Sequence, residues 1–212
     1  MTHAHSAVGA HARITTIAED LLWLLLDDFA GNTTVDSITL HRVLAGAVLA
    51  ELRSHDGAVP PRDPLLATVV AGHRRIVLDR AVDDLATGVR GPLLDRLCAD
   101  HRVDRRTRRS FRFIPRTTWP TSDPAGKAEL RHSLHSAVLD AHTPDTRTLA
   151  LIGLLHTAGA LPYQFPRWSR NTIDRRGRQI CLDHPDFADI IAAVRHAVCR
   201  ARADDYTVRY GF

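Results

Sequence analysis

Residues 146–158 read TRTLALIGLLHTA, a stretch in which Ala, Leu and Ile fill most positions. So few polar side chains leave no face suited to water, and the segment therefore predicts a helix that is buried on all sides. Gly159 follows, at the position where a residue with left-handed backbone commonly ends a helix. A helix of this kind has to be surrounded by other elements, so this stretch is expected to be buried in the fold.

Two further segments predict helices of the core. Residues 16–19 read TIAE, a capping-box pattern, and lead into 21–26, which is apolar around most of its circumference. Asp36 or Ser37 can cap the next helix. In that helix apolar residues recur at steps of three and four: Leu40, Val43, Leu44, Ala47, Val48 and Leu52.

The rest of the chain predicts short amphipathic helices and one hairpin. Residues 101–120 alternate Arg with apolar residues at period two and lose that alternation over 105–110, which predicts a β-hairpin with a basic tip. The predicted fold class is therefore all-α: a central helical bundle wrapped by amphipathic helices, with one basic β-hairpin. The expected short helices cover residues 63–71, 80–86, 92–99, 127–140, 170–182 and 185–203.

Composition predicts one domain with a polar tail. Residues 1–13 are small and polar, which predicts a disordered tail, and no Ser/Gly/Pro-rich linker divides residues 14–212, so these are expected to form a single domain. The three cysteines form no CxxC pair, which indicates reduced thiols in a cytosolic protein, and we interpret Cys181 and Cys199 as core fillers. The apolar run over 21–26 is too short to span a bilayer, so any membrane contact is expected at the cytoplasmic surface.

Positive charge is concentrated in the predicted hairpin. The chain has 28 basic and 24 acidic residues, and residues 101–120 hold seven arginines against Asp104 alone, a net charge of +6 with His101 neutral. Near an anionic leaflet each basic residue contributes about 1 kcal/mol, and burying Phe111 or Phe113 in the acyl boundary adds about 2 kcal/mol each. The segment therefore predicts reversible attachment to anionic lipid. The arginines of the predicted tip are Arg105, Arg106, Arg108 and Arg109.

Four parts of the chain carry longer motifs in a fixed order. Residues 14–31 contain ITTIAEDLL and LDD before a Gly, residues 44–52 read LAGAVLAEL, residues 93–120 predict a helix and then a hairpin, and residues 145–156 read DTRTLALIGLLH. In this order they resemble the Golgi phosphoprotein 3 family, and the last motif is the most specific of the four. The resemblance runs from about residue 14 to residue 203, and the Arg-rich, short-tailed form is similar to the bacterial branch of that family.

This resemblance implies a function at membranes. Members of the family have a four-helix core wrapped by amphipathic helices, and a basic pocket that binds the head group of phosphatidylinositol 4-phosphate beside a hairpin that dips into the bilayer. Eukaryotic members also bind glycosyltransferase tails and coat proteins. For this chain the resemblance implies a non-enzymatic peripheral membrane protein, an adaptor that binds anionic phospholipid such as phosphatidylinositol 4-phosphate or another phosphoinositide, together with a protein cargo.

The family's pocket residues can be carried over one position at a time. The resemblance places Asp36 where eukaryotic members have Trp, Ala45 where they have Arg, and Thr87 and Arg90 where they have two basic residues. Of these four only Arg90 keeps the family's chemistry, and Arg42, one turn before Ala45, is a candidate substitute charge. The predicted head-group residues are thus Arg90, Arg42, Arg105, Arg106, Arg108 and Arg109, and the predicted membrane-inserting residues are Phe111 and Phe113.

The residues alone leave other interpretations of the hairpin open. A helix followed by a basic hairpin is also the outline of a winged-helix nucleic-acid reader, and the sequence pI of about 9.4 is compatible with one. Against this, the central helices are too apolar to lie in a groove. The arginines could instead be a solvated edge that prevents aggregation, or the hairpin could pair with a copy of itself in a homo-oligomer.

Motifs of catalysis and of metal binding are sparse. His132 and His135 lie three apart on one predicted helix, but no HExxH or CxxC accompanies them, so we interpret both as surface histidines. His156 lies in the most buried predicted helix and is interpreted as a hydrogen-bonded core histidine. There is no GxSxG, Walker loop or GxGxxG. The sequence therefore predicts a protein that is not an enzyme and that holds no metal or cofactor.

Overall fold

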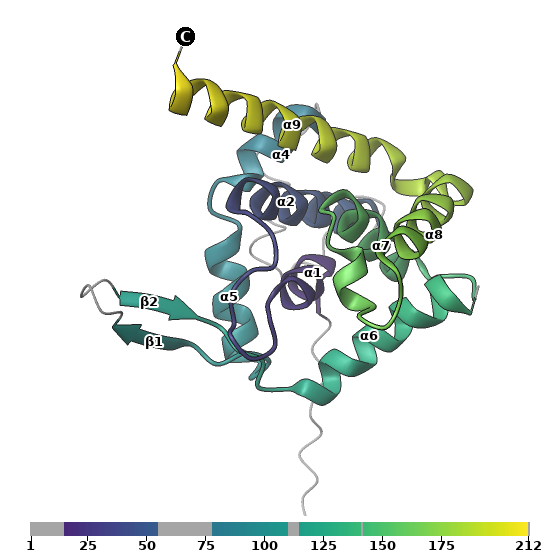
Figure 1. The fold of residues 1–212 in the computed structure, drawn as a ribbon, viewed down its shortest axis with the longest axis horizontal. Coiled ribbons are helices and arrows are strands. Elements are labelled where there is room, and N and C mark those ends of the chain that lie inside the picture. Colours follow the sequence, from purple (N-terminus) through teal and green to yellow (C-terminus); the bar gives the residue numbers. More distant parts are fainter. Residues whose placement is uncertain (1–14, 55–77, 110–114, 141, 212) are drawn as a thin grey trace, which may run out of the picture.

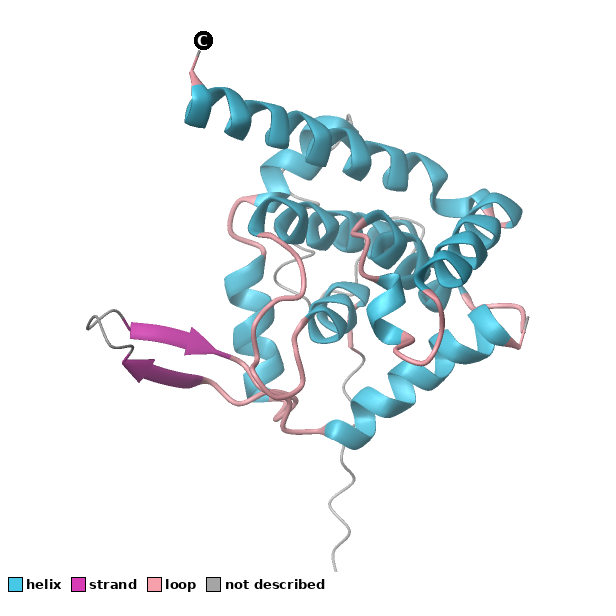
Figure 2. Ribbon diagram, in the orientation of Figure 1, coloured by secondary structure: helices cyan, strands magenta, loops and turns pink. Residues whose placement is uncertain are grey.

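A computed structural model describes residues 15–54, 78–109, 115–140 and 142–211. The predicted tail, 1–13, and the helix predicted over 63–71 lie outside these ranges. Helices dominate and the two strands form one antiparallel pair, which confirms the predicted fold class (Figure 2). In chain order the elements are α1 (Ile17–Leu25), α2 (Ser37–Ser54), α4 (Leu78–Ala86), α5 (Arg90–Ala99), β1 (Arg106–Arg109), β2 (Pro115–Thr118), α6 (Pro124–Leu139), α7 (Thr146–Thr157), η1 (Leu161–Gln164), α8 (Arg170–Asp183), η2 (Pro185–Phe187) and α9 (Ala188–Tyr210).

α1 lies at the centre of the molecule, where α2, α5, α6 and α7 all contact it (Figure 1). The predicted capping box begins this helix: the Thr16 hydroxyl accepts a hydrogen bond from the Glu19 backbone N–H, and the Glu19 carboxylate accepts one from the Thr16 backbone N–H. All nine residues of α1 are buried, Trp23 included. The burial of its apolar residues follows from the apolar circumference that the sequence showed.

α7 is the helix that the stretch at 146–158 predicted, and it is buried from Thr148 to Leu155. Asp145 caps it by accepting a hydrogen bond from the Thr148 backbone N–H at 2.7 Å. Gly159 follows the helix with a φ of +66°, as its position predicted. α1, α2, α6, α8 and α9 all pack against α7, so its burial on all sides is explained by five neighbouring helices.

α9 runs along α2 and α4 at the edge of the fold (Figure 1). Gly46 of α2 faces this helix and α7: a Cβ there would overlap the Val194 side chain and would lie 3.0 Å from Leu154 Cδ2. Glycine therefore permits a close approach of three helices. Only one side of α9 is covered, and Cys199 lies on the exposed side, so its interpretation as a core filler was wrong, whereas Cys181 is half-buried.

Two buried carboxylates of α1 tie distant parts of the chain to this central helix. Glu19 forms an ion pair with Arg96 of α5 at 2.7 Å. Asp20 forms ion pairs with Arg102 at 3.1 Å and with Arg147 of α7 at 2.6 Å. Buried charges require such partners, because the desolvation of an unpaired carboxylate costs several kcal/mol. We call these five residues the α1 ion-pair cluster.

The β1–β2 hairpin projects from the helical body (Figures 1 and 2). The predicted hairpin is present, but the basic residues at 106–109 form strand β1, whereas the sequence placed them in the tip. The reason for this difference is that Arg106, Thr107 and Arg108 are all exposed, so the strand needs no alternation of apolar and polar residues. The residues between the strands, 110–114, lie outside the described part of the chain.

Candidate functional site

The β1–β2 hairpin gathers arginines on one face. The antiparallel register pairs Arg108 with Arg116 and Thr107 with Thr117, and directly opposed residues share a face of the pair. Arg106 lies two residues from Arg108 and therefore shares its face. The opposite face carries the two threonines, whose hydroxyl oxygens are 3.2 Å apart. We call the surface formed by Arg106, Arg108 and Arg116 the arginine face.

The charges on the arginine face are only partly compensated. Arg106 forms an ion pair with Asp104 at 3.1 Å, and Arg116 donates a hydrogen bond to the side-chain oxygen of Asn32 at 2.9 Å. For Arg108 there is no ion pair or side-chain hydrogen bond within the described ranges. Arg108 and Arg116 are like charges directly opposite each other, an arrangement that destabilises a strand pair. The hairpin therefore carries positive charge that is not fully compensated, and a bound anion would reduce the repulsion between its arginines.

The base of the hairpin is fixed against the loop that follows α1. The Trp119 backbone N–H donates to the Gly31 carbonyl oxygen at 2.9 Å, and the Thr121 backbone N–H donates to the Asp28 carbonyl oxygen at 3.0 Å. Gly31 has a φ of +65°, and a Cβ there would overlap the backbone of Trp119 and Pro120. This glycine therefore sets how closely the hairpin approaches the helical body.

Lys127, the one lysine of the chain, is fully buried below the same loop. Its Nζ donates to the Leu26 carbonyl oxygen at 2.7 Å and forms an ion pair with Asp28 at 2.6 Å. Burial lowers the pKa of Lys127, while the hydrogen bond to Asp28 opposes that shift. Arg131 also pairs with Asp28, at 2.7 Å, so two cations of α6 hold the loop on which the hairpin rests.

A second group of basic residues lies at the foot of the hairpin, where α5 begins. The Arg90 guanidinium lies over the Trp119 ring, 5.0 Å from its centroid, and its buried Nε has no hydrogen-bond partner. Burial lowers the pKa of Arg90. Val89, which precedes the first turn of α5, makes no side-chain cap. An arginine with an unused donor beside an uncapped helix N-terminus is an arrangement that attracts an anion.

Arg42 and His41 of α2 lie close enough to Arg90 to interact with it electrostatically. Arg42 forms an ion pair with Asp83 at 3.1 Å, and Asp83 forms a second ion pair with Arg200 at 2.8 Å. One carboxylate is therefore shared by two guanidinium groups. Burial, with the positive charges of Arg90 and Arg42, lowers the pKa of His41, so its imidazole is neutral at pH 7. We call the following residues the basal cluster: Arg42, His41, Arg90 and Trp119.

The other positions carried over from the family have structural roles or remain at the surface. Asp36 caps α2 by accepting hydrogen bonds from Thr39, and it forms an ion pair with Arg202 of α9 at 2.7 Å. Although burial acts in the opposite direction, these hydrogen bonds lower the pKa of Asp36. Ala45 is completely buried and Thr87 is exposed. The charge of Asp36 is therefore compensated within the helix packing.

The predicted head-group residues fall into two sets. Trp119 connects the two sets, because it follows the hairpin strand β2 directly and its ring lies beneath the Arg90 guanidinium. The side chain of Arg109 lies outside the described part of the chain, as do Phe111 and Phe113, so their roles stay predictions. The set in the basal cluster comprises Arg42 and Arg90. The set on or next to the hairpin comprises Arg105, Arg106, Arg108 and Arg109.

Three residues of this surface were not predicted as part of the site. His41 adjoins Arg42 in the sequence, and Arg116 belongs to the predicted hairpin, so both could have been found from their neighbours. Trp119 was expected to have a packing role, and no local signal links it to Arg90, which lies on another element. A contact between distant segments of this kind becomes visible only in three dimensions.

The histidines of α6 do not form a metal site. His132 is exposed, as interpreted, but His135 is half-buried: its Nε2 lies 2.9 Å from the Gln164 carbonyl oxygen and its ring stacks on Phe165 with centroids 4.5 Å apart. The interpretation of His135 as a surface histidine was wrong, because η1 and the residue after it cover this part of α6. Within the described ranges no group of three His, Cys, Asp or Glu residues could hold a metal ion.

Comparison with known families agrees with the fold and with the order of the motifs. A family model described as Golgi phosphoprotein 3 (GPP34) matches residues 17–200, most of the 212-residue chain. The chain belongs to the Golgi phosphoprotein 3 family. This confirms the resemblance that the sequence motifs indicated. Both the hairpin and the basal cluster lie inside the region matched to the Golgi phosphoprotein 3 family. No curated protein matches the chain.

A helix that spans a membrane needs about 20 predominantly apolar residues. Among the helices that the structure describes, none is both long and apolar enough to cross a membrane. The longest of them, α9, carries charged residues along its length.

Proposed function

We propose that this Golgi phosphoprotein 3 family member is a peripheral membrane protein that binds anionic phospholipid reversibly from the cytoplasmic side. The observation that carries the proposal is the position of Arg108 directly opposite Arg116, on a hairpin that projects from the helical body (Figure 1). In water this pair weakens the hairpin, whereas a lipid phosphate placed between the two guanidinium groups removes the repulsion and accepts hydrogen bonds from both.

The hairpin supplies enough charge for reversible attachment. Each arginine within about 10 Å of an anionic surface contributes about 1 kcal/mol, so four that are engaged together contribute about 4 kcal/mol. Phe111 and Phe113, which lie between β1 and β2 in the sequence, are proposed to enter the acyl boundary and to add about 2 kcal/mol each. The sum corresponds to attachment that salt can reverse.

The basal cluster is the proposed binding site for a head-group phosphate. Arg90 keeps an unused Nε donor, and the stacking of its guanidinium on Trp119 holds the group in place. A phosphate monoester carries more charge than the phosphodiester of an ordinary phospholipid, so a site of this kind favours phosphatidylinositol 4-phosphate or another phosphoinositide. The arginine face then engages the surrounding anionic lipid.

The proposed biological role is that of a non-catalytic adaptor between a membrane and a protein cargo. Attachment through a single hairpin is reversible, and pairing of two hairpins in a homo-oligomer would strengthen it by avidity. Family membership supports this role.

Vesicle flotation tests the proposal. The full chain is mixed with neutral phosphatidylcholine vesicles, with vesicles containing phosphatidylserine, and with vesicles of equal charge containing phosphatidylinositol 4-phosphate. We expect no flotation with neutral vesicles, flotation with both anionic kinds, stronger binding to the phosphoinositide, and loss of binding as salt rises. Equal flotation with neutral vesicles contradicts the proposal. Preference for duplex DNA over anionic vesicles at the same salt would instead favour a nucleic-acid-binding function.

A further inference from the structure

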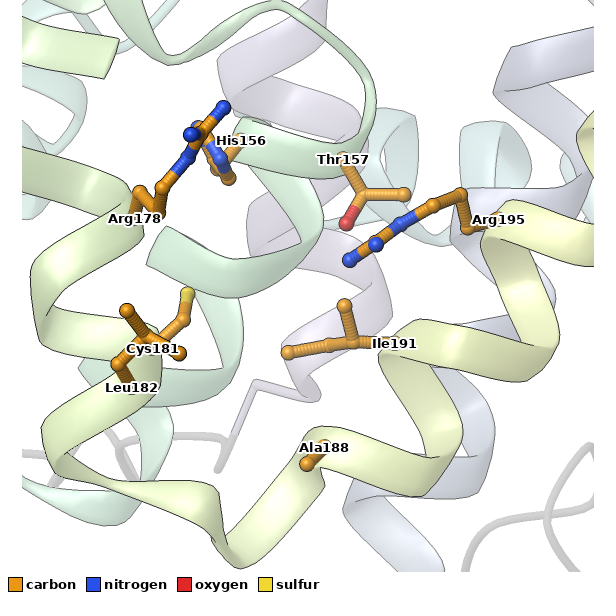
Figure 3. A pocket seen from close by; sticks show the side chains of 8 residues that line it. All are labelled: His156, Thr157, Arg178, Cys181, Leu182, Ala188, Ile191 and Arg195. Atoms are coloured by element: carbon orange, nitrogen blue, oxygen red, sulfur yellow. The ribbon is translucent and has the colours of Figure 1, made fainter. Parts of the chain in front are cut away.

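A cleft of about 530 Å³ lies between α7, α8 and α9 (Figure 3). This volume is within the range of small-molecule sites, which is roughly 300–1,000 Å³. α7 contributes His156, α8 contributes Arg178 and Cys181, and α9 contributes Ala188 and, farther along, a second arginine. In Figure 1 α8 and the first turns of α9 lie at the right of the view and the hairpin at the left, so the cleft is separate from the proposed lipid-binding surface.

Half of the residues that line the cleft are apolar or weakly polar, and they lie on α8 and α9. Ile191, Ala188 and Leu182 present aliphatic groups, and Cys181 adds a thiol. Burial raises the pKa of Cys181, so this thiol is protonated at neutral pH and acts as a small apolar group. Leu182 is 68% exposed, a large fraction for an aliphatic side chain. Ile191, Ala188 and Leu182 are therefore available for contact with an apolar group of a ligand.

Two arginines line the cleft, one on α8 and one on α9. Figure 3 shows Arg178 of α8 beside His156, and Arg195 of α9 with its guanidinium directed inward, past Ile191. Neither arginine has an ion pair or a side-chain hydrogen bond in the part of the chain that the structure describes. Two guanidinium groups together offer two positive charges and several fixed donors, which matches a doubly charged oxyanion.

His156 supplies a third polar group with an unused position. Its Nδ1 is buried and has no hydrogen-bond partner, so the interpretation of this residue as a hydrogen-bonded core histidine was wrong. The reason is its place in the last turn of α7, where the neighbouring groups are Arg178, Arg195 and Asp174. The Asp174 carboxylate lies 3.9 Å from Nδ1 and equally 3.9 Å from Arg170 Nε. Burial chiefly lowers the pKa of His156, which is therefore neutral at pH 7.

We propose that this cleft binds a phosphate monoester that carries a short apolar group. Arg178 and Arg195 hold the phosphate between them, His156 offers a hydrogen bond, and the apolar group lies on Ile191 and Ala188. The cleft combines two unpaired guanidinium groups with an apolar surface, and this combination favours an anion that carries an apolar group. Free phosphate would leave the apolar surface in contact with water. Because the cleft lies away from the hairpin, the ligand is expected from solution and not from the attached bilayer.

Isothermal titration calorimetry of the full chain with hexyl phosphate, inorganic phosphate and hexanol tests the two halves of the proposal. We expect hexyl phosphate to bind at least about ten-fold more tightly than inorganic phosphate, because burial of several methylene groups adds to the charge interaction. Hexanol, which lacks the charge, is expected not to bind. Failure of hexyl phosphate to bind, or equal binding of all three compounds, overturns the proposal.

Variants of the two arginines test the charge interaction. Arg178→Gln and Arg195→Gln are each expected to weaken hexyl phosphate binding about ten-fold or more, and the double variant is expected to abolish it. Both side chains are exposed, so the variants are expected to fold. Arg167→Gln, at an exposed arginine just before α8, is the matched control and should bind as the parent does. Unchanged binding by the double variant overturns the proposal.

Ala188→Phe tests the apolar interaction separately. Ala188 is exposed at the start of α9, so a larger side chain there fills the cleft without entering the core. We expect this variant to lose about ten-fold in affinity for hexyl phosphate and to bind inorganic phosphate as the parent does. Equal affinity of the parent and the variant for hexyl phosphate would place the ligand elsewhere. Neither result depends on the hairpin, so the membrane proposal and this one can fail independently.

Discussion

The arginines around α1 and the arginines of the β1–β2 hairpin differ in the charges that lie next to them. In the α1 ion-pair cluster Arg96, Arg102 and Arg147 each reach a buried carboxylate. On the arginine face, Arg108 is opposed by another arginine and has no described ion-pair partner. The first group satisfies charges that burial would otherwise make costly, while the second leaves positive charge in water.

This difference separates the arginines that stabilise the fold from those available to a ligand. An arginine paired with a buried acid is not available to a ligand, because its departure would leave the buried carboxylate without a cation, at a cost of several kcal/mol. An arginine that faces like charge gains from any anion that approaches. The arginine-rich composition of the chain therefore says little by itself, and the partner of each guanidinium decides its role. The comparison makes predictions for both groups.

The largest effect is expected in the α1 ion-pair cluster. Arg147→Ala removes ion-pair and hydrogen-bond contacts with Asp20, whose side chain is 6% exposed, and with the backbone oxygens of Thr15 and Thr16. We expect the free energy of unfolding to fall by about 3 kcal/mol, because a buried carboxylate loses one of its two cations. Urea denaturation measures it. Arg175→Ala, at an exposed site of α8, should cost less than about 0.5 kcal/mol. Equal effects at the two positions would contradict the comparison.

Arg90 is expected to affect the choice of lipid more than the attachment itself. Arg90→Gln removes the guanidinium that lies over Trp119, and we expect about a ten-fold loss of affinity for phosphatidylinositol 4-phosphate vesicles. Binding to phosphatidylserine vesicles of equal charge should change much less. Arg80→Gln, at an exposed position of α4, controls for the lost charge. A uniform loss on both lipids would show that Arg90 is one surface charge among many.

Arg108 is expected to show opposite effects on stability and on binding. Arg108→Thr removes the like-charge pair with Arg116, so we expect the free energy of unfolding to rise by a few tenths of a kcal/mol, about 0.3. Vesicle affinity should fall by about five-fold, which corresponds to about 1 kcal/mol. Thermal unfolding and flotation measure the two quantities. A fall in both would mean that Arg108 stabilises the hairpin through contacts that its position does not suggest.

The smallest effect concerns a surface ion pair between α2 and α9. Arg53 and Asp189 are 40% and 50% exposed, and the hydrogen bond from Arg53 lowers the pKa of Asp189 below 3.8. A lowered carboxyl pKa stabilises the fold above the unfolded-state value, and this stabilisation is lost as the pH falls through the folded-state value. We expect Asp189→Asn to cost about 0.5 kcal/mol at pH 7 and less at pH 3. Denaturation at both pH values tests this, and a difference that does not shrink in acid would contradict it.

Most of the helical fold could be predicted because its signals are local. The capping box at Thr16 and the apolar run of α7 each depend on neighbours within a few residues of the sequence. The hairpin was predicted as well, but the residues of its first strand were assigned to the tip. A strand exposed on both faces carries no alternation to mark it, so charge density alone could not place Arg106 and Arg108 on β1.

The candidate site was less predictable, because its members meet across the fold. Arg42 was predicted as a head-group residue from its place on α2, but its ion pair with Asp83 of α4 had no sequence signal. The cleft beside α7 depends on Arg178 and Arg195, which look like ordinary surface charges in two amphipathic helices. Three-dimensional packing decides which arginines are paired with an acid. The sequence shows only that each residue is an arginine, and it does not show whether that arginine has a partner.

The central claim is that the hairpin arginines attach the protein to anionic membranes, and flotation of two charge-matched variants tests it most directly. The hairpin variant replaces by Ser the residues Arg105, Arg106, Arg108 and Arg109. The control variant replaces by Gln the exposed residues Arg80, Arg167, Arg175 and Arg176. With phosphatidylserine vesicles at low salt, we predict at least about a 100-fold loss of affinity for the hairpin variant, unchanged circular dichroism, and near-parent binding for the control. Parent-like binding by the hairpin variant, or equal loss in both, would contradict the claim.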